Sequence, residues 1–258
     1  YVTAEAYNGF LSGYDDYLDI NFDWTANSMN IMGQMYLSGK MNNEIYTLKE
    51  MLQQPDRHEF EKAMRAEVQA MFDNDIWTKV SRDSMNKYYS SLRRKGHDLK
   101  RKQIMMIWSF KQKRHPDGRL DKYKVRLCCH GGQQQWGAQY WETYSPVVSW
   151  MAVRTLLVLS KLHNLNTRAI DFTLAFPQAD VKVPIYLHTP QGIIFDSHEN
   201  VVLKLKKNLY GLKDAGRTWW EHLSEGLNEM GFAQSETDQC VFVKGETIIL
   251  IYVDDCVI

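Results

Sequence analysis

The sequence predicts an α+β fold with an antiparallel sheet. Apolar residues recur at helical spacing in three segments, and two other segments read as strand pairs joined by a turn. The resulting order is helix, hairpin, helix, strands, helix, hairpin, and such grouping is typical of α+β proteins. The chain has 258 residues, of which 44% are hydrophobic and 24% charged, so it can bury a core. No apolar run reaches the roughly 20 residues that span a bilayer.

The first part of the chain is expected to be a linker. Residues 1–49 are rich in Asn, Asp, Tyr, Gly and Met without helical or strand periodicity, and we take residues 1–55 as an acidic, loosely ordered arm. A helix then begins at Asp56, which can act as its cap with Glu59 reaching back. This helix should start the folded domain. Its predicted buried residues, at helical spacing, are Phe60, Met64, Val68 and Met71.

A basic β-hairpin is predicted over residues 104–127. The turn residues HPDG separate its two strands, and a polar, basic stretch precedes it from Trp77 onward. Apolar residues and cations alternate in the second strand: Tyr123, Val125 and Leu127 with Lys122, Lys124 and Arg126. Because successive side chains point to opposite faces, the three cations share one surface. The alternative is an ordinary solvated sheet face.

Charge is distributed unevenly although the formal net charge is zero. Residues 1–80 carry 6 Lys and Arg against 13 Asp and Glu, whereas residues 87–126 carry 14 against 3. Such a basic block is the electrostatic signature expected for a polyphosphate partner. The four cysteines form no C-x-x-C pair, which favours a reducing, intracellular setting over a disulfide framework or a zinc site.

The remaining elements complete the predicted sheet. Residues 146–165 are expected to form a mostly buried helix, and a short strand follows that ends at Asp171. Further strands are predicted in IYLHTP and VVLKLKK, then a helix over residues 214–230 closed by Gly231. The second hairpin has its apex at Asp254-Asp255. The chain begins without Met and ends within an apolar run, so we expect it to be a piece of a longer protein.

Carboxylates at strand ends are the candidate catalytic residues. Asp171 ends one strand, and Tyr252-Val253-Asp254-Asp255 joins two others. Acidic residues at such places are often only turn or cap residues. Charge at the edge of a buried sheet is costly, however, unless a cation compensates it, and carboxylate oxygens are ligands that Mg²⁺ prefers.

Residues from about 56 to 258 resemble the reverse transcriptase domain of copia-type LTR retrotransposons. Seven stretches match in family order: EFEKAMRAEVQAMFDNDIW, WSFKQKRHPDGRLDKYKVRL, YWETYSPVVSWMAVRTLL, AIDFTLAFPQAD, IYLHTPQG, LKKNLYGLKDAGRTWW and IYVDD. The resemblance implies a right-hand polymerase with residues 56–165 as fingers and residues 166–258 as a palm that is incomplete at its C-terminus. The thumb would be absent.

The resemblance also implies a chemistry, RNA-directed DNA synthesis with two Mg²⁺ ions, for which Mn²⁺ is a substitute. The ions, roughly 3.5–4 Å apart, would stabilise the attacking and leaving oxygens as a primer 3′-hydroxyl attacks a dNTP. The family's metal ligands correspond to Asp171 and Asp254, with Asp255 adjoining.

Other site residues carry over from the family one position at a time. Phe176 matches the aromatic residue that excludes a 2′-hydroxyl, with a core phenylalanine as the alternative. Residues of the LYGLK turn match those that pack on the nucleotide base and template: Tyr210, Gly211 and Lys213. Lys124 and Arg126 resemble the residues that hold the triphosphate, although Lys122 competes for that role. Nucleic-acid contacts are expected from Lys122, Arg119 and Tyr252. The sequence departs from the family at Pro177 and at residues 214–216, away from the metal ligands.

The implied partners are an RNA or DNA template with its primer, a dNTP, and further polyprotein domains, namely thumb, ribonuclease H and integrase. The implied location is the cytoplasm, including virus-like particles, with no membrane. One alternative is a truncated or decayed remnant that at most binds nucleic acid. Another is a two-metal nuclease, which explains the aspartates but neither Phe176 nor the LYGLK turn.

Overall fold

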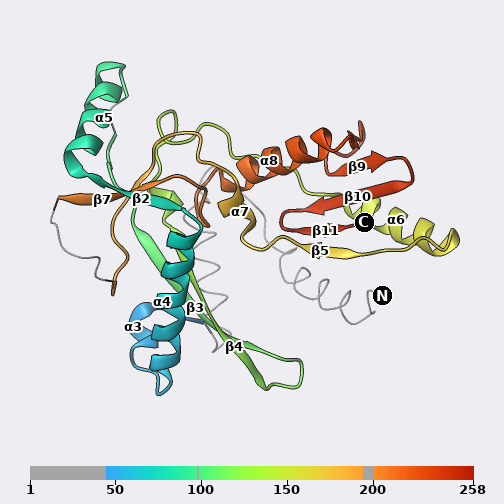
Figure 1. Cartoon of the computed structure of the whole chain (residues 1–258), viewed down its shortest axis with the longest axis horizontal. Coiled ribbons are helices and arrows are strands. Elements are labelled where there is room, and N and C mark those ends of the chain that lie inside the picture. The colour runs from blue at the N-terminus through green and yellow to red at the C-terminus, as the bar shows by residue number, and fades with distance from the viewer. Residues whose placement is uncertain (1–44, 98, 194–199) are drawn as a thin grey trace, which may run out of the picture. The chain divides into compact units, whose positions relative to one another are not determined.

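The computed structural model describes residues 45–97, 99–193 and 200–258 (Figure 1). Within this part of the chain, helices accompany three sheets whose named strands all pair in antiparallel fashion, so the predicted α+β class is confirmed. The described residues divide into two compact units. We call residues 45–144 and 176–219 the hairpin unit and residues 145–175 and 220–258 the carboxylate unit, and describe each by itself. Most of the predicted arm, residues 1–44, lies outside the described residues.

The hairpin unit contains two three-stranded sheets, in the orders β1-β3-β4 and β2-β7-β6. Its strands are β1 (Ile45–Tyr46), β2 (Trp77–Ser81), β3 (Met106–Arg114), β4 (Leu120–Cys129), β6 (Tyr186–Leu187) and β7 (Val201–Leu205). Its helices are α3 (Leu48–Met51), α4 (Arg57–Asp73), α5 (Arg82–Arg94) and the 3₁₀ turn η1 (Gly131–Gln133). The described chain passes between the units after Tyr144, within α7 (Ala175–Gln178) and within α8 (Ala215–Glu229).

Helix α4 buries the predicted residues Phe60, Met64, Val68 and Met71. The Phe60 ring is fully buried and lies edge-on to three other rings, with centroid distances of 5.8 Å to Tyr46, 5.7 Å to Phe110 and 4.7 Å to Tyr123. Such pairs each contribute about 0.5–1.5 kcal/mol beyond the burial of their surface. Phe60 therefore joins α4 to the sheet that carries the basic hairpin.

The fold begins before the predicted helix start at Asp56. Strand β1 pairs with β3, and Met51 of α3 is fully buried. The capping box lies at Thr47, where the Glu50 N–H donates to Thr47 Oγ1 (3.3 Å) and the Thr47 N–H to Glu50 Oε2 (2.9 Å). Asp56 is the N-cap of α4, but its side chain makes no capping bond, and its carboxylate accepts a hydrogen bond from Gln112 Nε2 (2.8 Å).

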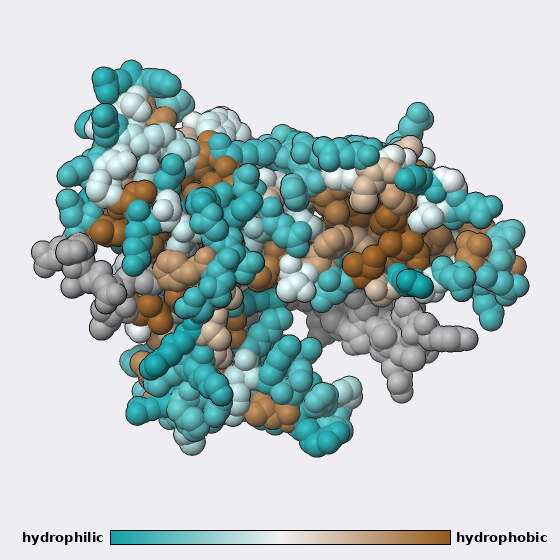
Figure 2. Space-filling model, in the orientation of Figure 1, coloured by the Kyte–Doolittle hydropathy of each residue, from teal (hydrophilic) through white to brown (hydrophobic). Residues whose placement is uncertain are grey.

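The predicted hairpin is confirmed as β3 and β4. Trp108 pairs with Leu127 and Phe110 with Val125 on the buried face. The opposite face carries Lys111 and Lys113, and on the side of the molecule shown in Figure 2 the hairpin is largely hydrophilic. A two-faced ribbon of this kind is what the period-two pattern predicts.

Strand β2 and helix α5 were not predicted from the sequence. Strand β2 pairs with β7 over its whole length, and Ser81 caps α5 by accepting a hydrogen bond from the Ser84 N–H (3.1 Å). Helix α5 buries only Met85 and Tyr89. The sequence does carry the helical pattern: Tyr88 and Leu92, partly buried beside Met85 and Tyr89, complete an apolar stripe at helical spacing.

The carboxylate unit is built on a five-stranded sheet with the order β5-β11-β10-β9-β8 (Figure 1). The strands are β5 (Ala169–Asp171), β8 (Ala233–Gln234), β9 (Val241–Lys244), β10 (Thr247–Tyr252) and β11 (Asp255–Val257). Hydrophobic residues gather over β10 and β11 (Figure 2), and Phe242, Ile251 and Cys256 lie in this core. Helix α8 matches the predicted helix and ends before Gly231, whose φ is 86°.

The prediction of a mostly buried helix over residues 146–165 is wrong. Helix α6 spans Trp150–Leu162, and Leu156 is the one residue of it that is buried. Met151 is 73% exposed and Leu162 is 69% exposed. The helix is apolar on more than one face, and only one face packs against the sheet of its own unit.

The four cysteines, all within the described residues, are free thiols, as expected from their spacing. Among the described helices, none is long and apolar enough to traverse a bilayer.

Candidate active site

The carboxylates predicted to be catalytic lie together at one end of the five-stranded sheet. Asp171 is the last residue of β5, and its pairing partner is Asp255, the first residue of β11. Asp254 directly precedes Asp255, and its carbonyl oxygen accepts a hydrogen bond from the Phe172 N–H (2.9 Å). The backbone thus brings Asp171 and Asp254 to adjacent strand ends, although more than 80 residues separate them in sequence.

The turn between β10 and β11 lies one residue earlier in the chain than predicted. Tyr252 pairs with Asp255, so the apex consists of Val253 and Asp254 rather than Asp254 and Asp255. Val253 has a φ of 57°, in the left-handed region that β-branched residues rarely adopt. This conformation reverses the chain within two residues and leaves Asp255 in the strand opposite Asp171.

Negative charge is concentrated at this site. Partial burial raises the pKa of the Asp255 carboxyl above its usual range, and the neighbouring carboxylates of Asp254 and Asp171 raise the pKa further. Each cause disfavours the ionised form. A bound cation would act in the opposite direction, by favouring the ionised carboxylates.

The donor set fits Mg²⁺ in the way that nucleotide enzymes hold it. No cluster of three or more His, Cys, Asp or Glu side chains in the described residues forms a ready-made metal site. Mg²⁺ is commonly bound by one or two carboxylates that act together with water and substrate phosphates, rather than by an all-protein cage. Asp171, Asp254 and Asp255 supply hard oxygen donors of that kind.

The structure brings together three of the predicted nucleotide-binding residues in the hairpin unit. The rings of Phe176 and Tyr210 lie 5.2 Å apart, and the Arg126 guanidinium carbon lies 5.2 Å from the Tyr210 ring centroid. These residues come from three separate segments of the chain. Phe176 is partly buried and packs against the core of the unit, so both the predicted role and the core alternative agree with its position.

The turn that carries Tyr210 lies very close to the backbone at Gly131, and both backbone segments have a glycine at the point of contact. Gly211 has a φ of 87°, and a Cβ built on Gly131 would lie 2.1 Å from the Gly211 carbonyl oxygen. The Cys129 N–H donates to the Tyr210 carbonyl oxygen (2.7 Å). The end of the basic hairpin is therefore attached directly to this turn.

Lys213 is already engaged by a neighbouring loop. Its Nζ donates to the Tyr140 hydroxyl (3.0 Å) and lies 4.8 Å from the Tyr140 ring centroid, and its N–H donates to Gln134 Oε1 (2.7 Å). The side chain and backbone of Lys213 together fasten Tyr140 and Gln134 to the turn. Its predicted contact with a nucleotide stays a prediction.

The predicted cationic face exists and is larger than expected. Lys122 lies opposite Lys113, and Lys124 lies opposite Lys111, so two lysine pairs share the face with Arg126. Directly opposed like charges destabilise a sheet. Desolvation lowers the pKa of Lys124, and Arg126, Lys113, Lys122 and Lys111 lower it further. Extending the period-two pattern of the second strand to WSFKQK would have identified Lys111 and Lys113.

Two of the predicted nucleic-acid contacts, Arg119 and Tyr252, have partners within the chain, and an acidic residue that was not predicted lies beside the cationic face. Arg119 forms an ion pair with Asp117 (2.7 Å) inside the hairpin turn. Tyr252 packs against the core of the carboxylate unit. Glu67 of α4, which was not predicted, accepts a hydrogen bond from the Leu127 N–H (3.3 Å). Burial raises the pKa of Glu67, while that hydrogen bond and then Arg126 and Lys124 act to lower it.

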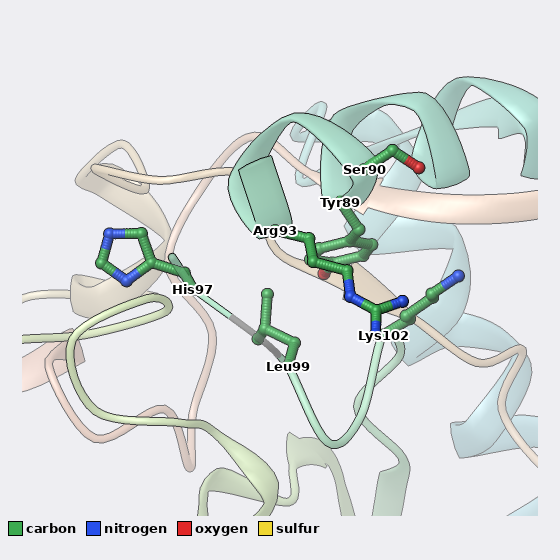
Figure 3. Close-up of a pocket in the computed structure, with 6 residues that line it drawn as sticks. All are labelled: Tyr89, Ser90, Arg93, His97, Leu99 and Lys102. Carbon is green, nitrogen blue, oxygen red and sulfur yellow. The ribbon is translucent and has the colours of Figure 1, made fainter. Parts of the chain in front are cut away.

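A small cavity of about 90 Å³ lies beside α5 (Figure 3). Its lining residues are Tyr89, Ser90, Arg93, His97, Leu99 and Lys102. None of them is among the predicted site residues, and the cations there belong to the basic block over residues 87–126.

Comparison with known proteins is consistent with this site. The family model described as reverse transcriptase (RNA-dependent DNA polymerase) matches residues 95–258. The Pol polyprotein from transposon TNT 1-94 of Nicotiana tabacum is 32% identical over 222 residues, which cover 84% of this chain and 16% of that polyprotein. The Pol polyprotein from transposon RE1 of Arabidopsis thaliana is 38% identical over 155 residues, covering 58% of this chain and 11% of the relative. No solved structure matches the chain.

The chain belongs to the reverse transcriptase (RNA-dependent DNA polymerase) family, a family of nucleotidyltransferases, and to its copia-type group. A more distant relative, the Transposon Ty1-BL Gag-Pol polyprotein of Saccharomyces cerevisiae, is 28% identical over 204 residues, or 79% of this chain and 11% of the relative. The chain therefore spans less than a fifth of the length of each of these three polyproteins. Reverse transcriptases generally use divalent metal ions.

Proposed function

We propose that this chain is the fingers and palm of an RNA-directed DNA polymerase that transfers nucleotides from dNTPs to a primer 3′-hydroxyl. In this proposal the hairpin unit supplies most of the fingers and the carboxylate unit most of the palm, and a thumb comes from elsewhere in the polyprotein. The observation that carries the proposal is the pairing of Asp171 with Asp255 beside Asp254. Family membership supports it independently.

The carboxylates would hold two divalent ions, Mg²⁺ with Mn²⁺ as a substitute. When bound, such ions stabilise the developing charge on the attacking and leaving oxygens. Asp171 and Asp254 bind and position them, and Asp255 adds negative charge beside them. The raised pKa of Asp255 supports this role, because a site with a carboxylate excess is suited to a cation rather than to an anion.

Residues of the hairpin unit would bind the nucleotide. Phe176 excludes the 2′-hydroxyl by its ring, while Tyr210 and Gly211 pack on the base. Lys124 and Arg126 hold the triphosphate, with Lys122 as the competing candidate. Desolvation lowers the pKa of Lys124, and the neighbouring cations lower it further. A polyanionic ligand would relieve the repulsion between these cations, which supports the assignment.

The partners would be a primed RNA or DNA template, dNTPs and the other polyprotein domains, including ribonuclease H and integrase. Lys122, Arg119 and Tyr252 would contact nucleic acid. We place this activity in the cytoplasm, including virus-like particles. The free thiols of all four cysteines agree with a reducing compartment.

A hybrid polyprotein tests the function. The chain replaces the corresponding segment of the TNT 1-94 Pol polyprotein, and Mg²⁺-dependent extension of a DNA primer on an RNA template is measured. The unmodified polyprotein is assayed in parallel. We expect the hybrid to extend the primer, and Asp254→Asn to lower the rate by roughly 100-fold or more, because metal stabilisation contributes several kcal/mol.

Two results would overturn the proposal. An inactive hybrid beside an active parent polyprotein would identify the chain as a non-catalytic remnant. Unchanged activity of the Asp254→Asn hybrid would remove the role of the carboxylate. Circular dichroism of the isolated variant chain shows whether its fold is intact.

A further inference from the structure

A loop of the hairpin unit exposes several aromatic side chains to solvent. Trp136 is 69% exposed, Trp141 53% and Tyr144 65%. Trp136 and Trp141 are the only tryptophans that lie exposed in the part of the chain that the structure describes. Single exposed apolar residues are common, but a concentration of large aromatic rings in a stretch of nine residues is not explained by chance exposure.

The polar edge of one ring is already satisfied within the loop. Trp136 Nε1 donates to the carbonyl oxygen of Trp141 (2.9 Å). What Trp136 offers to a ligand is therefore its apolar ring face rather than a hydrogen-bond donor. A ligand that stacks fits this better than one that must be recognised by hydrogen bonds.

Hydrogen bonds hold the loop in one conformation. The Gly137 N–H donates to the Tyr140 carbonyl oxygen (2.9 Å), and the Gln135 N–H donates to Oε1 of the buried Gln139 (2.9 Å). At the other end, the Arg217 guanidinium donates to the Tyr144 carbonyl oxygen (3.2 Å) and pairs with Glu142 (3.3 Å). Because the loop is ordered before binding, less conformational entropy is lost when a ligand arrives.

The loop is also continuous with the turn assigned to the nucleotide. Lys213 reaches Tyr140 through its Nζ (3.0 Å) and Gln134 through its N–H (2.7 Å). Between residues 131 and 144 the loop has one formal charge, Glu142, and Arg217 pairs with it. The exposed surface is thus aromatic and almost uncharged, unlike the cationic face of the hairpin.

We propose that Trp136, Trp141 and Tyr144 form a stacking platform for the unpaired bases of a single-stranded nucleic acid. The inference deepens the proposed function. It rests on that function only for the identity of the strand, which would be the unpaired template ahead of the primer. Every base has a flat aromatic face, so stacking tolerates any sequence, as a template site requires. The phosphates of the same strand are left to the lysines elsewhere in the unit.

The test compares a 12-nucleotide oligo(dT) with an abasic strand of equal length, which keeps the phosphates and lacks the bases. Binding to the whole chain is measured by fluorescence anisotropy without metal or dNTP, so that its failure is distinguishable from failure of polymerisation. We expect oligo(dT) to bind more tightly than the abasic strand, by roughly 5- to 150-fold for each stacked base. Trp136→Ala should remove most of the preference for oligo(dT) that one stacked base provides. The affinity for the abasic strand should stay unchanged.

Two further variants complete the design. Trp136→Phe keeps a ring and should retain most of the preference for bases. Leu162→Ala removes an apolar side chain of equal 69% exposure from the carboxylate unit and should change neither affinity. Equal binding of the two strands by the unchanged chain would overturn the proposal and favour a protein partner for this surface. Equal weakening of both strands by Trp136→Ala would overturn it as well.

Discussion

Asp171 faces Asp255 across the pairing of β5 with β11, and two carboxylates thereby occupy neighbouring positions on one face of the sheet. The raised pKa of Asp255 means that the folded chain binds this proton more tightly than the unfolded chain does. The free energy of unfolding should therefore fall as pH rises from the ordinary aspartate range through the raised value. Above that value the full penalty of the ionised carboxylates is present.

Mg²⁺ should reverse this penalty at neutral pH. At a concentration about five times its Kd, the ion should contribute roughly 1 kcal/mol and raise Tm by about 2–4 °C, measured by thermal unfolding. The rise in Tm should vanish below the ordinary aspartate range, where protons occupy the carboxylates.

The Asp255→Asn variant tests the same site. In EDTA its free energy of unfolding should be at least that of the unchanged chain, and its Tm should rise less with Mg²⁺. The matched control is Glu246→Gln, an exposed carboxylate of the same unit. A Mg²⁺ effect independent of pH would contradict this prediction.

Phe176→Val should admit ribonucleotides. Trimming the ring removes the clash with a 2′-hydroxyl, so discrimination between dGTP and GTP in the hybrid polyprotein should fall by roughly 10- to 100-fold with little change in dGTP use. Phe72→Val is the control, because Phe72 is also partly buried against the same core. If both variants discriminate between dGTP and GTP as strongly as the unchanged chain does, Phe176 is only a core residue.

The cationic face should determine how salt affects nucleic-acid binding. Replacing Lys122, Lys124 and Arg126 together with Gln should flatten the plot of log affinity against log salt by roughly two to three units, since each phosphate contact contributes about 0.7–0.9. The charge-matched control replaces Arg57, Lys62 and Arg65 of α4. An equal loss of slope in both triple variants would mean that net charge alone, and not this face, is responsible.

Gly131→Ala should destabilise the hairpin unit. The new Cβ would lie 2.1 Å from the Gly211 carbonyl oxygen, a backbone atom that can move only with its turn. Overpacking of this kind costs about 1–3 kcal/mol, measurable by urea unfolding. Gly226→Ala is the control, since Gly226 lies within α8 with open space where a Cβ would be added, and should stabilise by about 0.5–1 kcal/mol. Equal stability of the two variants would contradict the close approach.

The sequence predicted elements whose pattern is strong within the element itself. Helix α4 repeats four buried residues at helical spacing, and β4 alternates cations with core residues. These two features depend on local spacing, which is visible in one dimension. The convergence of Asp171 and Asp254 does not depend on local spacing, and it was expected from the family resemblance and from the need of two-metal chemistry for both ions in one place.

Features that depend on distant partners could not be predicted in this way. Helix α6 is apolar on several faces, and the position of its packing partner decides which face is buried. The sequence around Met151 does not show that this side chain is exposed. Asp56 stands at the N-cap of α4, but its carboxylate accepts a hydrogen bond from Gln112, a residue far along the chain, and makes no capping bond. Helix α5 is a different case, because the helical spacing of Met85, Tyr88, Tyr89 and Leu92 is visible in the sequence but stands among many polar and basic residues.

The φ of 57° at Val253 also has an energetic consequence for the neighbouring carboxylate. A β-branched residue in this region costs of the order of 1–3 kcal/mol, and glycine would avoid most of the cost. Glycine would also let the turn sample many conformations, whereas valine is stiff at χ1 and restricts them. The chain thus accepts lower stability at this turn, and Asp254 is held in its place before any ligand binds.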